Sequence, residues 1–150
     1  MSTSKFDLAY MKTARAMAGL SHDPDTQVGA VIVKDKHIIS TGYNGTPKGT
    51  DNTMKCANGN TLDTVIHAEM NAILYAKVDL TGATCYTTFY PCKRCAIHLY
   101  QAGIREIVYA DSKGSADQDA AGRWIAETSN LKIRRVSDES NTEDTRVSKK

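Results

Sequence analysis

The sequence predicts a single α/β domain with three α/β/α layers, built on five strands. Segments with the apolar spacing of helices alternate with short runs rich in β-branched residues along most of the chain. From residue 84 onward the order strand, helix, strand, helix, strand is typical of parallel pairing. A chain of 150 residues is long enough for one such domain, which we place at residues 1–136.

The N-terminal part of the chain predicts one helix and two strands. Ser4 and Asp7 have the spacing of a capping box at the start of an amphipathic helix over residues 5–20. The apolar stripe of this helix, which we expect in the core, consists of Phe6, Tyr10, Ala14, Met17 and Leu20. Residues 27–33 form a nearly continuous apolar run, typical of a strand buried on both faces. A short turn then returns the chain into a second strand over residues 37–43.

The rest of the domain begins with a long loop. Gly, Pro, Asn and Asp are dense between residues 44 and 62, and loops of this length are often functional. The remaining elements are predicted at residues 67–76 (helix), 84–88 (strand), 92–101 (helix), 104–109 (strand), 115–129 (helix) and 131–136 (strand). Gly103 is expected as a helix C-cap. Residues 137–150 have no aromatic side chain and one Val among polar residues, so we expect a disordered tail.

Charge and composition favour a small-molecule enzyme. The formal net charge is only +2 and there is no long basic run, so we expect no nucleic-acid partner. No stretch approaches the roughly 18 apolar residues of a membrane span, and the N-terminus lacks the apolar core of a signal peptide. Four cysteines fit a reducing compartment better than a disulfide framework. We therefore expect no membrane association and a cytoplasmic location.

Two short motifs predict a metal site. Glu69 follows His67 by two residues, and Pro91 precedes a pair of cysteines, Cys92 and Cys95, that are three residues apart. At the start of a helix these two thiols lie on one face, where the helix dipole favours the thiolate form. One imidazole, two thiolates and a water complete a tetrahedral catalytic zinc site. We therefore predict one Zn²⁺ per chain bound by His67, Cys92 and Cys95, with Glu69 free to transfer protons.

Other interpretations of these residues stay open from local sequence. A CxxC pair alone is also typical of redox pairs and zinc fingers, although its occurrence with H-x-E is improbable by chance. The side chain of Asn44 can bind a ligand, or it can merely close an Asn-Gly turn with Gly45. Cys56 and Cys85 have no evident role as metal ligands.

Four blocks of the chain resemble deoxycytidylate deaminases of the cytidine deaminase superfamily. They are SHDP with QVGA, GYNGTP, HAEMNAI, and PCKRCA with QAGI, at residues 21–30, 42–47, 67–73 and 91–104. The second block favours deoxycytidylate (dCMP), whereas the zinc motifs are shared by the superfamily. The resemblance implies a cytidine-deaminase-like fold with a five-stranded mixed sheet. The chain departs from the family in the Phe89-Tyr90 pair, and residues 62–66 lack the His and Cys of a second zinc site.

The resemblance also implies a reaction, the hydrolytic deamination of dCMP to dUMP and ammonia by a zinc-bound hydroxide. Glu69 would take a proton from the water, pass it to ring N3, and carry a second proton to the departing amino group. The backbone N–H of Ala68 would hold the pyrimidine O2, and Asn44 the deoxyribose. The residues expected to contact substrate are Asn44, Ala68, Phe89, Tyr90 and, near the phosphate, Thr26.

Deoxycytidylate deaminases resemble one another in forming hexamers that dCTP activates and dTTP inhibits, so we expect the same here. The loop at residues 42–49 could seat a triphosphate with Mg²⁺ through the backbone amides of Gly45 and Gly49 and the charge of Lys48. Asn44 would link this site to the substrate, although the glycines can also serve the turn alone. Deaminases of free cytidine, tRNA or single-stranded nucleic acid would share the zinc site, and a non-catalytic zinc module would bind metal without turnover.

Overall fold

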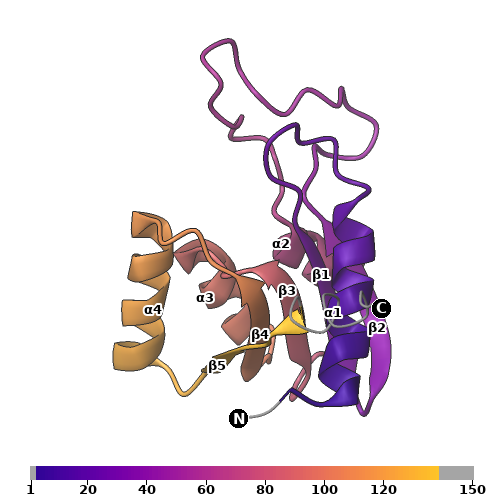
Figure 1. The fold of residues 1–150 in the computed structure, drawn as a ribbon, viewed down its shortest axis with the longest axis vertical. Coiled ribbons are helices and arrows are strands. Elements are labelled where there is room, and N and C mark those ends of the chain that lie inside the picture. The colour runs from indigo at the N-terminus through magenta and orange to yellow at the C-terminus, as the bar shows by residue number, and fades with distance from the viewer. Residues whose placement is uncertain (1–2, 139–150) are drawn as a thin grey trace, which may run out of the picture.

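A five-stranded sheet forms the centre of the computed structural model, which describes residues 3–138. The elements are α1 (Lys5–Ala18), β1 (Gly29–Lys34), β2 (His37–Tyr43), α2 (Ala68–Tyr75), β3 (Thr84–Phe89), α3 (Lys93–Gln101), β4 (Glu106–Asp111), α4 (Ala116–Thr128) and β5 (Lys132–Arg135). Figure 1 shows them in place, with the long loop between β2 and α2 projecting beyond the sheet.

The sheet is mixed, as predicted. The strand order is β2-β1-β3-β4-β5. β1 pairs antiparallel with both β2 and β3, whereas β3 with β4 and β4 with β5 pair in parallel. The two parallel pairs are those joined by α3 and α4, because a strand reached through a crossover helix runs in the same direction.

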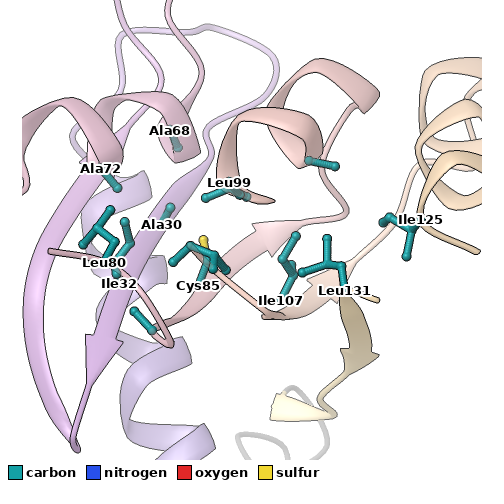
Figure 2. Packing of buried hydrophobic residues seen from close by; sticks show 13 residues of the cluster. Ala30, Ile32, Ala68, Ala72, Leu80, Cys85, Leu99, Ile107, Ile125 and Leu131 are labelled. Carbon is teal, nitrogen blue, oxygen red and sulfur yellow. The ribbon is translucent and has the colours of Figure 1, made fainter. Parts of the chain in front are cut away.

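Helices cover both faces of the sheet, so the predicted three-layer fold is confirmed. On one face α1 packs through Met11 and Ala14 against Val31 of β1. On the other face α2, α3 and α4 share a core with Ile32 of β1 and Ile107 of β4, which Figure 2 shows from close by. Neighbouring residues of β1 point to opposite faces, so both must be apolar.

The predicted stripe of α1 is partly wrong. The capping box of Ser4 and Asp7 is present, but Phe6 is 42% and Leu20 is 55% exposed. The helix ends at Ala18, so Leu20 lies beyond it. The buried residues of the helix are Asp7, Met11, Ala14 and Ala18. Their spacing of four, three and four residues follows the helical period more closely than the stripe chosen from the sequence.

Several element boundaries differ from the predictions by one or two residues. The first strand begins at Gly29, not at 27, and β4 begins at Glu106, not at 104. The C-cap of α3 is Ala102, and Gly103 follows it with φ of 108°. α2 and α3 each begin one residue later than predicted, because His67 and Cys92 are extended N-cap residues and not helical ones.

The described chain continues past the predicted domain boundary. Val136 is buried, and Asp138 accepts hydrogen bonds from Arg15, with Nε to Oδ2 at 2.5 Å. Arg15 also contacts Asp111, at 3.2 Å. The rest of the predicted tail, residues 139–150, lies outside the described residues. Within residues 3–138 no helix has the length and apolarity to cross a membrane.

Candidate active site

The first turn of α2 is held against the sheet by Gly42 of β2. A Cβ at Gly42 would lie 2.4 Å from the carbonyl oxygen of Ala68 and 2.6 Å from the amide nitrogen of Ala72. Only glycine permits this approach, since both obstacles are backbone atoms. Ser40 adds a hydrogen bond from its hydroxyl to the Ala72 carbonyl, at 2.6 Å. The position of His67, immediately before this turn, is therefore fixed by backbone contacts.

The start of α3 brings the two cysteines together. Cys92 is the N-cap residue, and its Sγ accepts a hydrogen bond from the backbone amide of Cys95, at 3.4 Å. The preceding Pro91 is buried and cannot donate a backbone hydrogen bond. Both thiols thus lie at the N-terminal end of the helix, where its dipole favours negative charge.

The two helix starts converge on a group that fits a metal ion. His67 Nδ1 lies 3.5 Å from Cys92 Sγ and 3.3 Å from Cys95 Sγ, and the three ligand atoms lie within 4.8 Å of one another. A tetrahedral zinc with ordinary bond lengths would hold nitrogen and sulfur ligands about 3.5 Å apart. Elsewhere in residues 3–138 no other three metal-binding side chains gather so closely. The donor set therefore suits zinc with a fourth position left over.

The surroundings shift the pKa values of the two thiols in opposite directions. The hydrogen bond from the Cys95 thiol, with a further one from His67, lowers the pKa of Cys92. The same interaction with Cys92, together with burial, raises the pKa of Cys95. The Cys92 thiol is therefore the more easily deprotonated of the two, and a metal ion would have to displace the proton of Cys95.

Glu69 lies beside this group without joining it. Its side chain is buried, with 4% of the residue exposed, and this burial raises its pKa. Thr87 of β3 donates a hydrogen bond to Glu69 Oε2, at 3.2 Å. A raised pKa makes a carboxyl group a better proton acceptor when ionised and leaves it able to return the proton, which is the property that general acid-base catalysis needs.

A cavity of about 340 Å³ opens onto Glu69, His67 and Cys92. All five predicted substrate residues line it, namely Thr26, Asn44, Ala68, Phe89 and Tyr90. They come from segments that are far apart in the sequence. This volume lies in the range of small-molecule sites.

Asn44 supports the cavity wall through its own hydrogen bonds. Its Oδ1 accepts from the amide of Val28 at 2.9 Å, and its Nδ2 donates to the carbonyl of Thr26 at 3.0 Å. Asn44 also lines a second cavity, of about 780 Å³, below the loop at residues 42–50. It therefore lies in the wall between the two cavities.

The neighbouring aromatic residues Phe89 and Tyr90 have rings in different surroundings. The ring of Tyr90 packs edge-on against Tyr109, with centroids 4.8 Å apart, and its hydroxyl lies next to Gly122 of α4. The ring of Phe89 instead has the ammonium group of Lys113 5.5 Å from its centroid. Tyr90 is thus partly engaged in packing, whereas Phe89 carries a charged neighbour at the cavity.

The predicted regulatory residues lie at the larger cavity, with one correction. Lys48 lines it, 5.3 Å from the ring centroid of Tyr75. The amide of Gly45 donates to the carbonyl of Ile66 at 3.0 Å, so it is not free to bind phosphate as expected. Gly49 has φ of 85°, the left-handed conformation that glycine favours.

Sequence reasoning missed about half of the wall of the smaller cavity. The residues concerned are Val28, Lys55, Thr61, Val65, Lys113, Ser115, Asp117 and Gln118. Lys55 comes from the irregular loop before α2, and Lys113 from the turn before α4. The sequence offered only the long polar loop at residues 44–62, and nothing in it linked Lys55 to Lys113.

Comparisons with known proteins agree with this geometry. Residues 4–111 match the family described as the cytidine and deoxycytidylate deaminase zinc-binding region. The human deoxycytidylate deaminase is 35% identical over 136 residues, covering 84% of this chain and 76% of the relative. That of Mycobacterium phage D29 is 36% identical over 124 residues, covering 73% and 97%. The structure of cyanophage S-TIM5 dCMP deaminase with dCMP and dUMP matches with a TM-score of 0.80 and 27% identity, covering 91% and 100%.

The fold and the His, Cys, Cys and Glu cluster define the class of this protein as a zinc-dependent deaminase, a hydrolase. The chain belongs to the cytidine and deoxycytidylate deaminase family, because the family match covers more than half of it and several relatives exceed 30% identity.

Proposed function

We propose that the protein deaminates dCMP to dUMP with release of ammonia. The observation that carries this proposal is the cavity in which Glu69, His67 and Cys92 meet a rim of polar and cationic side chains. A free base or nucleoside would need no cationic group there, whereas a nucleotide would. The likeness to deoxycytidylate deaminases from human and phage supports the same substrate.

His67, Cys92 and Cys95 would bind the metal in this reaction. When bound, zinc supplies Lewis acidity that lowers the pKa of a water molecule to about 7. Glu69 would accept a proton from that water and deliver it to N3 of the cytosine ring, while the water oxygen bonds to C4. Glu69 would then transfer the second proton of the water to the amino group, and the C4–N bond would break to release ammonia.

The substrate would be oriented by groups on the cavity wall. The backbone amide of Ala68 would donate to the pyrimidine O2, and Phe89 would flank the ring or the sugar. Asn44 would act on the deoxyribose, although its hydrogen bonds to Val28 and Thr26 limit its reach. Tyr90 would contribute mainly through its backbone and the packing of its ring on Tyr109.

A turnover assay across substrate classes tests the proposal. The panel contains dCMP, CMP, dCTP, deoxycytidine, adenosine, a tRNA and a cytosine-containing single-stranded oligonucleotide, with ammonia release as the readout. We expect the highest kcat/KM with dCMP. A higher value with any other substrate would reassign the substrate, and zinc binding without turnover of any of them would reject the deaminase proposal.

We further propose the regulation and assembly that the family resemblance implies: a cytoplasmic hexamer activated by dCTP and inhibited by dTTP, each bound with Mg²⁺. Support comes from the larger cavity, which holds Lys48 and shares Asn44 with the substrate cavity. An effector can act only through its different affinity for two states, typically about 1–3 kcal/mol.

The regulatory proposal predicts a change in the shape of the saturation curve. We expect a sigmoidal dependence on dCMP alone, a hyperbolic one with dCTP and Mg²⁺, and suppression by dTTP. Unchanged kinetics with both triphosphates, together with no binding of either by calorimetry, would reject the regulation and leave the deaminase proposal intact.

A further inference from the structure

Two lysines line the cavity that contains Glu69 within the described part of the chain, and they differ in how their charge is balanced. Lys55 Nζ lies 3.6 Å from Asp23 and 3.5 Å from Asp25, so two carboxylates compensate it. Lys113 forms no ion pair with any carboxylate of residues 3–138. The positive charge available to an anion in this cavity is therefore that of Lys113.

The ammonium group of Lys113 is directed to the cavity by two contacts. Its Nζ donates a hydrogen bond to the hydroxyl of Thr26, at 2.7 Å, and lies 5.5 Å from the ring centroid of Phe89. An ammonium group has three N–H bonds, so two remain for a ligand. The Thr26 hydroxyl accepts from Lys113 and can itself donate to an oxygen anion. The pair presents a compact set of donors at one part of the wall.

Gln118 of α4 holds the turn that carries Lys113. Its Oε1 accepts three hydrogen bonds, from the hydroxyl of Ser112 at 2.7 Å and from the amides of Lys113 and Gly114 at 2.9 and 3.0 Å. Its Nε2 donates to the carbonyl of Tyr90, at 3.0 Å. One amide side chain therefore ties the turn to the segment just before the cysteines. Such fixing lowers the entropic cost of binding.

The other charged groups on the cavity wall make an anionic ligand depend on Lys113 for its binding. Asp117 lines the same cavity and would repel an anion, and Asp23 is already engaged by Lys55. Removing the charge of Lys113 would leave Lys55, which Asp23 and Asp25 already compensate, as the lysine on this wall. The neutral part of a ligand would be less affected by this change.

We propose that Lys113, with the hydroxyl of Thr26, binds the 5′-phosphate of a nucleoside monophosphate and thereby selects it over the free nucleoside. This inference rests on the proposed deamination of a cytosine nucleotide. It assigns a role to Lys113 that neither motif spacing nor resemblance provided. Gln118 acts in this scheme as a positioning residue.

The test compares kcat/KM for dCMP and for deoxycytidine in three variants and the parent protein. For Lys113→Met the ratio of the two values should fall about tenfold to hundredfold, mainly through KM for dCMP, since a charged hydrogen bond is lost. Lys113→Arg should keep more of the preference than Lys113→Met. The control is Lys12→Met, which removes an equal charge at an exposed position of α1 and should leave the ratio as it is.

A binding measurement separates failure of this inference from failure of the proposed function. We would titrate 2-deoxyribose 5-phosphate by calorimetry into the parent protein and into Lys113→Met. Weaker binding to the variant by about tenfold supports the phosphate site even if dCMP is not turned over. Equal binding, or equal losses of kcat/KM with both substrates, would overturn it.

Discussion

The cavity has two regions that are built in different ways. The metal corner consists of His67, Glu69, Cys92 and Cys95. The substrate rim consists of Thr26, Lys55, Lys113 and Gln118. The corner comes from two short segments at the starts of α2 and α3, and backbone contacts to the sheet fix it. The rim is assembled from side chains of separate segments, of which Lys113 is solvent-exposed and the others are half-buried, and they meet through hydrogen bonds and ion pairs.

This difference indicates that catalysis depends on the metal corner and that substrate selectivity depends on the substrate rim. Groups that transfer protons or hold a metal need a fixed geometry, which helix starts packed against the sheet provide. Groups that distinguish one substrate from another need only meet the variable part of the substrate. Changes in the metal corner should therefore affect turnover of every substrate, and changes in the substrate rim should affect KM for one of them.

The largest effect is expected from removing a ligand of the metal corner. Cys92→Ala should lose the single zinc per chain, because two protein ligands hold the ion far more weakly than three, and turnover should become undetectable with all substrates. Metal analysis and ammonia release measure both quantities. Cys56→Ala is the matched control, since this exposed thiol hydrogen-bonds to Asn58 and Asn60 away from the metal ligands and should leave the zinc in place. Two tightly held zincs per chain would contradict the assignment.

The next effect separates proton transfer from metal binding within the metal corner. Glu69→Gln keeps the size of the side chain and its contact with Thr87, but it cannot carry a proton. We expect kcat to fall by about 10² to 10⁴ with every substrate, with zinc content and substrate affinity retained. Glu127→Gln, at an exposed position of α4, serves as the control. Turnover close to that of the parent would remove Glu69 from the mechanism.

The same contrast explains what the sequence could predict. The metal corner could be predicted because its spacing is local: Glu69 lies two positions after His67, and Cys95 lies three positions after Cys92. The rim was not, because Thr26 and Lys113 are 87 positions apart and no local pattern links them.

The fold followed the same rule. The periodicity of the apolar residues predicted the order of strands and helices, the parallel crossovers and the helices on both faces of the sheet. The structure has all three features. The prediction for the buried side of α1 was wrong because Phe6, in the first turn, is apolar but exposed. The ammonium groups of Lys5 and Lys36 lie beside its ring. Helix starts were displaced because the ligands themselves are N-caps.

A substitution of Asp7, which lies away from the cavity, should change the free energy of unfolding without affecting the metal corner or the substrate rim. Burial alone would raise the pKa of Asp7, but hydrogen bonds from Arg134 and Tyr86 lower it to about 2, from 3.8. A depressed carboxyl pKa stabilises the fold above the unfolded-state value, so the contribution of about 2 kcal/mol is present above about pH 4 and is lost as pH falls toward 2.

Urea unfolding of the parent and of Asp7→Asn at several pH values measures this contribution. The variant should be less stable at pH 7, and the difference should shrink between about pH 4 and pH 2, where other titrating groups cancel in the comparison. The ratio of kcat/KM for dCMP and deoxycytidine should stay the same. A difference that does not depend on pH would mean that Asp7 stabilises through packing alone.

The smallest effect, and the sharpest test of the contrast, concerns Gln118. Gln118→Leu removes the amide oxygen that accepts from Ser112, Lys113 and Gly114, and the amide nitrogen that donates to Tyr90. The leucine that replaces it has a side chain of similar size. Lys113 keeps its charge but loses its fixed position. We therefore expect KM for dCMP to rise about threefold to tenfold, with kcat nearly constant and deoxycytidine affected less.

The matched control is Gln101→Leu, at an exposed position near the end of α3. A purely structural role for Gln118 would lower kcat and raise KM for both substrates together, because the segment before Cys92 would move with Tyr90. A rise confined to KM for dCMP would instead place Gln118 with the substrate rim. The double variant Gln118→Leu with Lys113→Met separates the two further: if Gln118 acts through Lys113, adding its substitution should cost little beyond Lys113→Met alone.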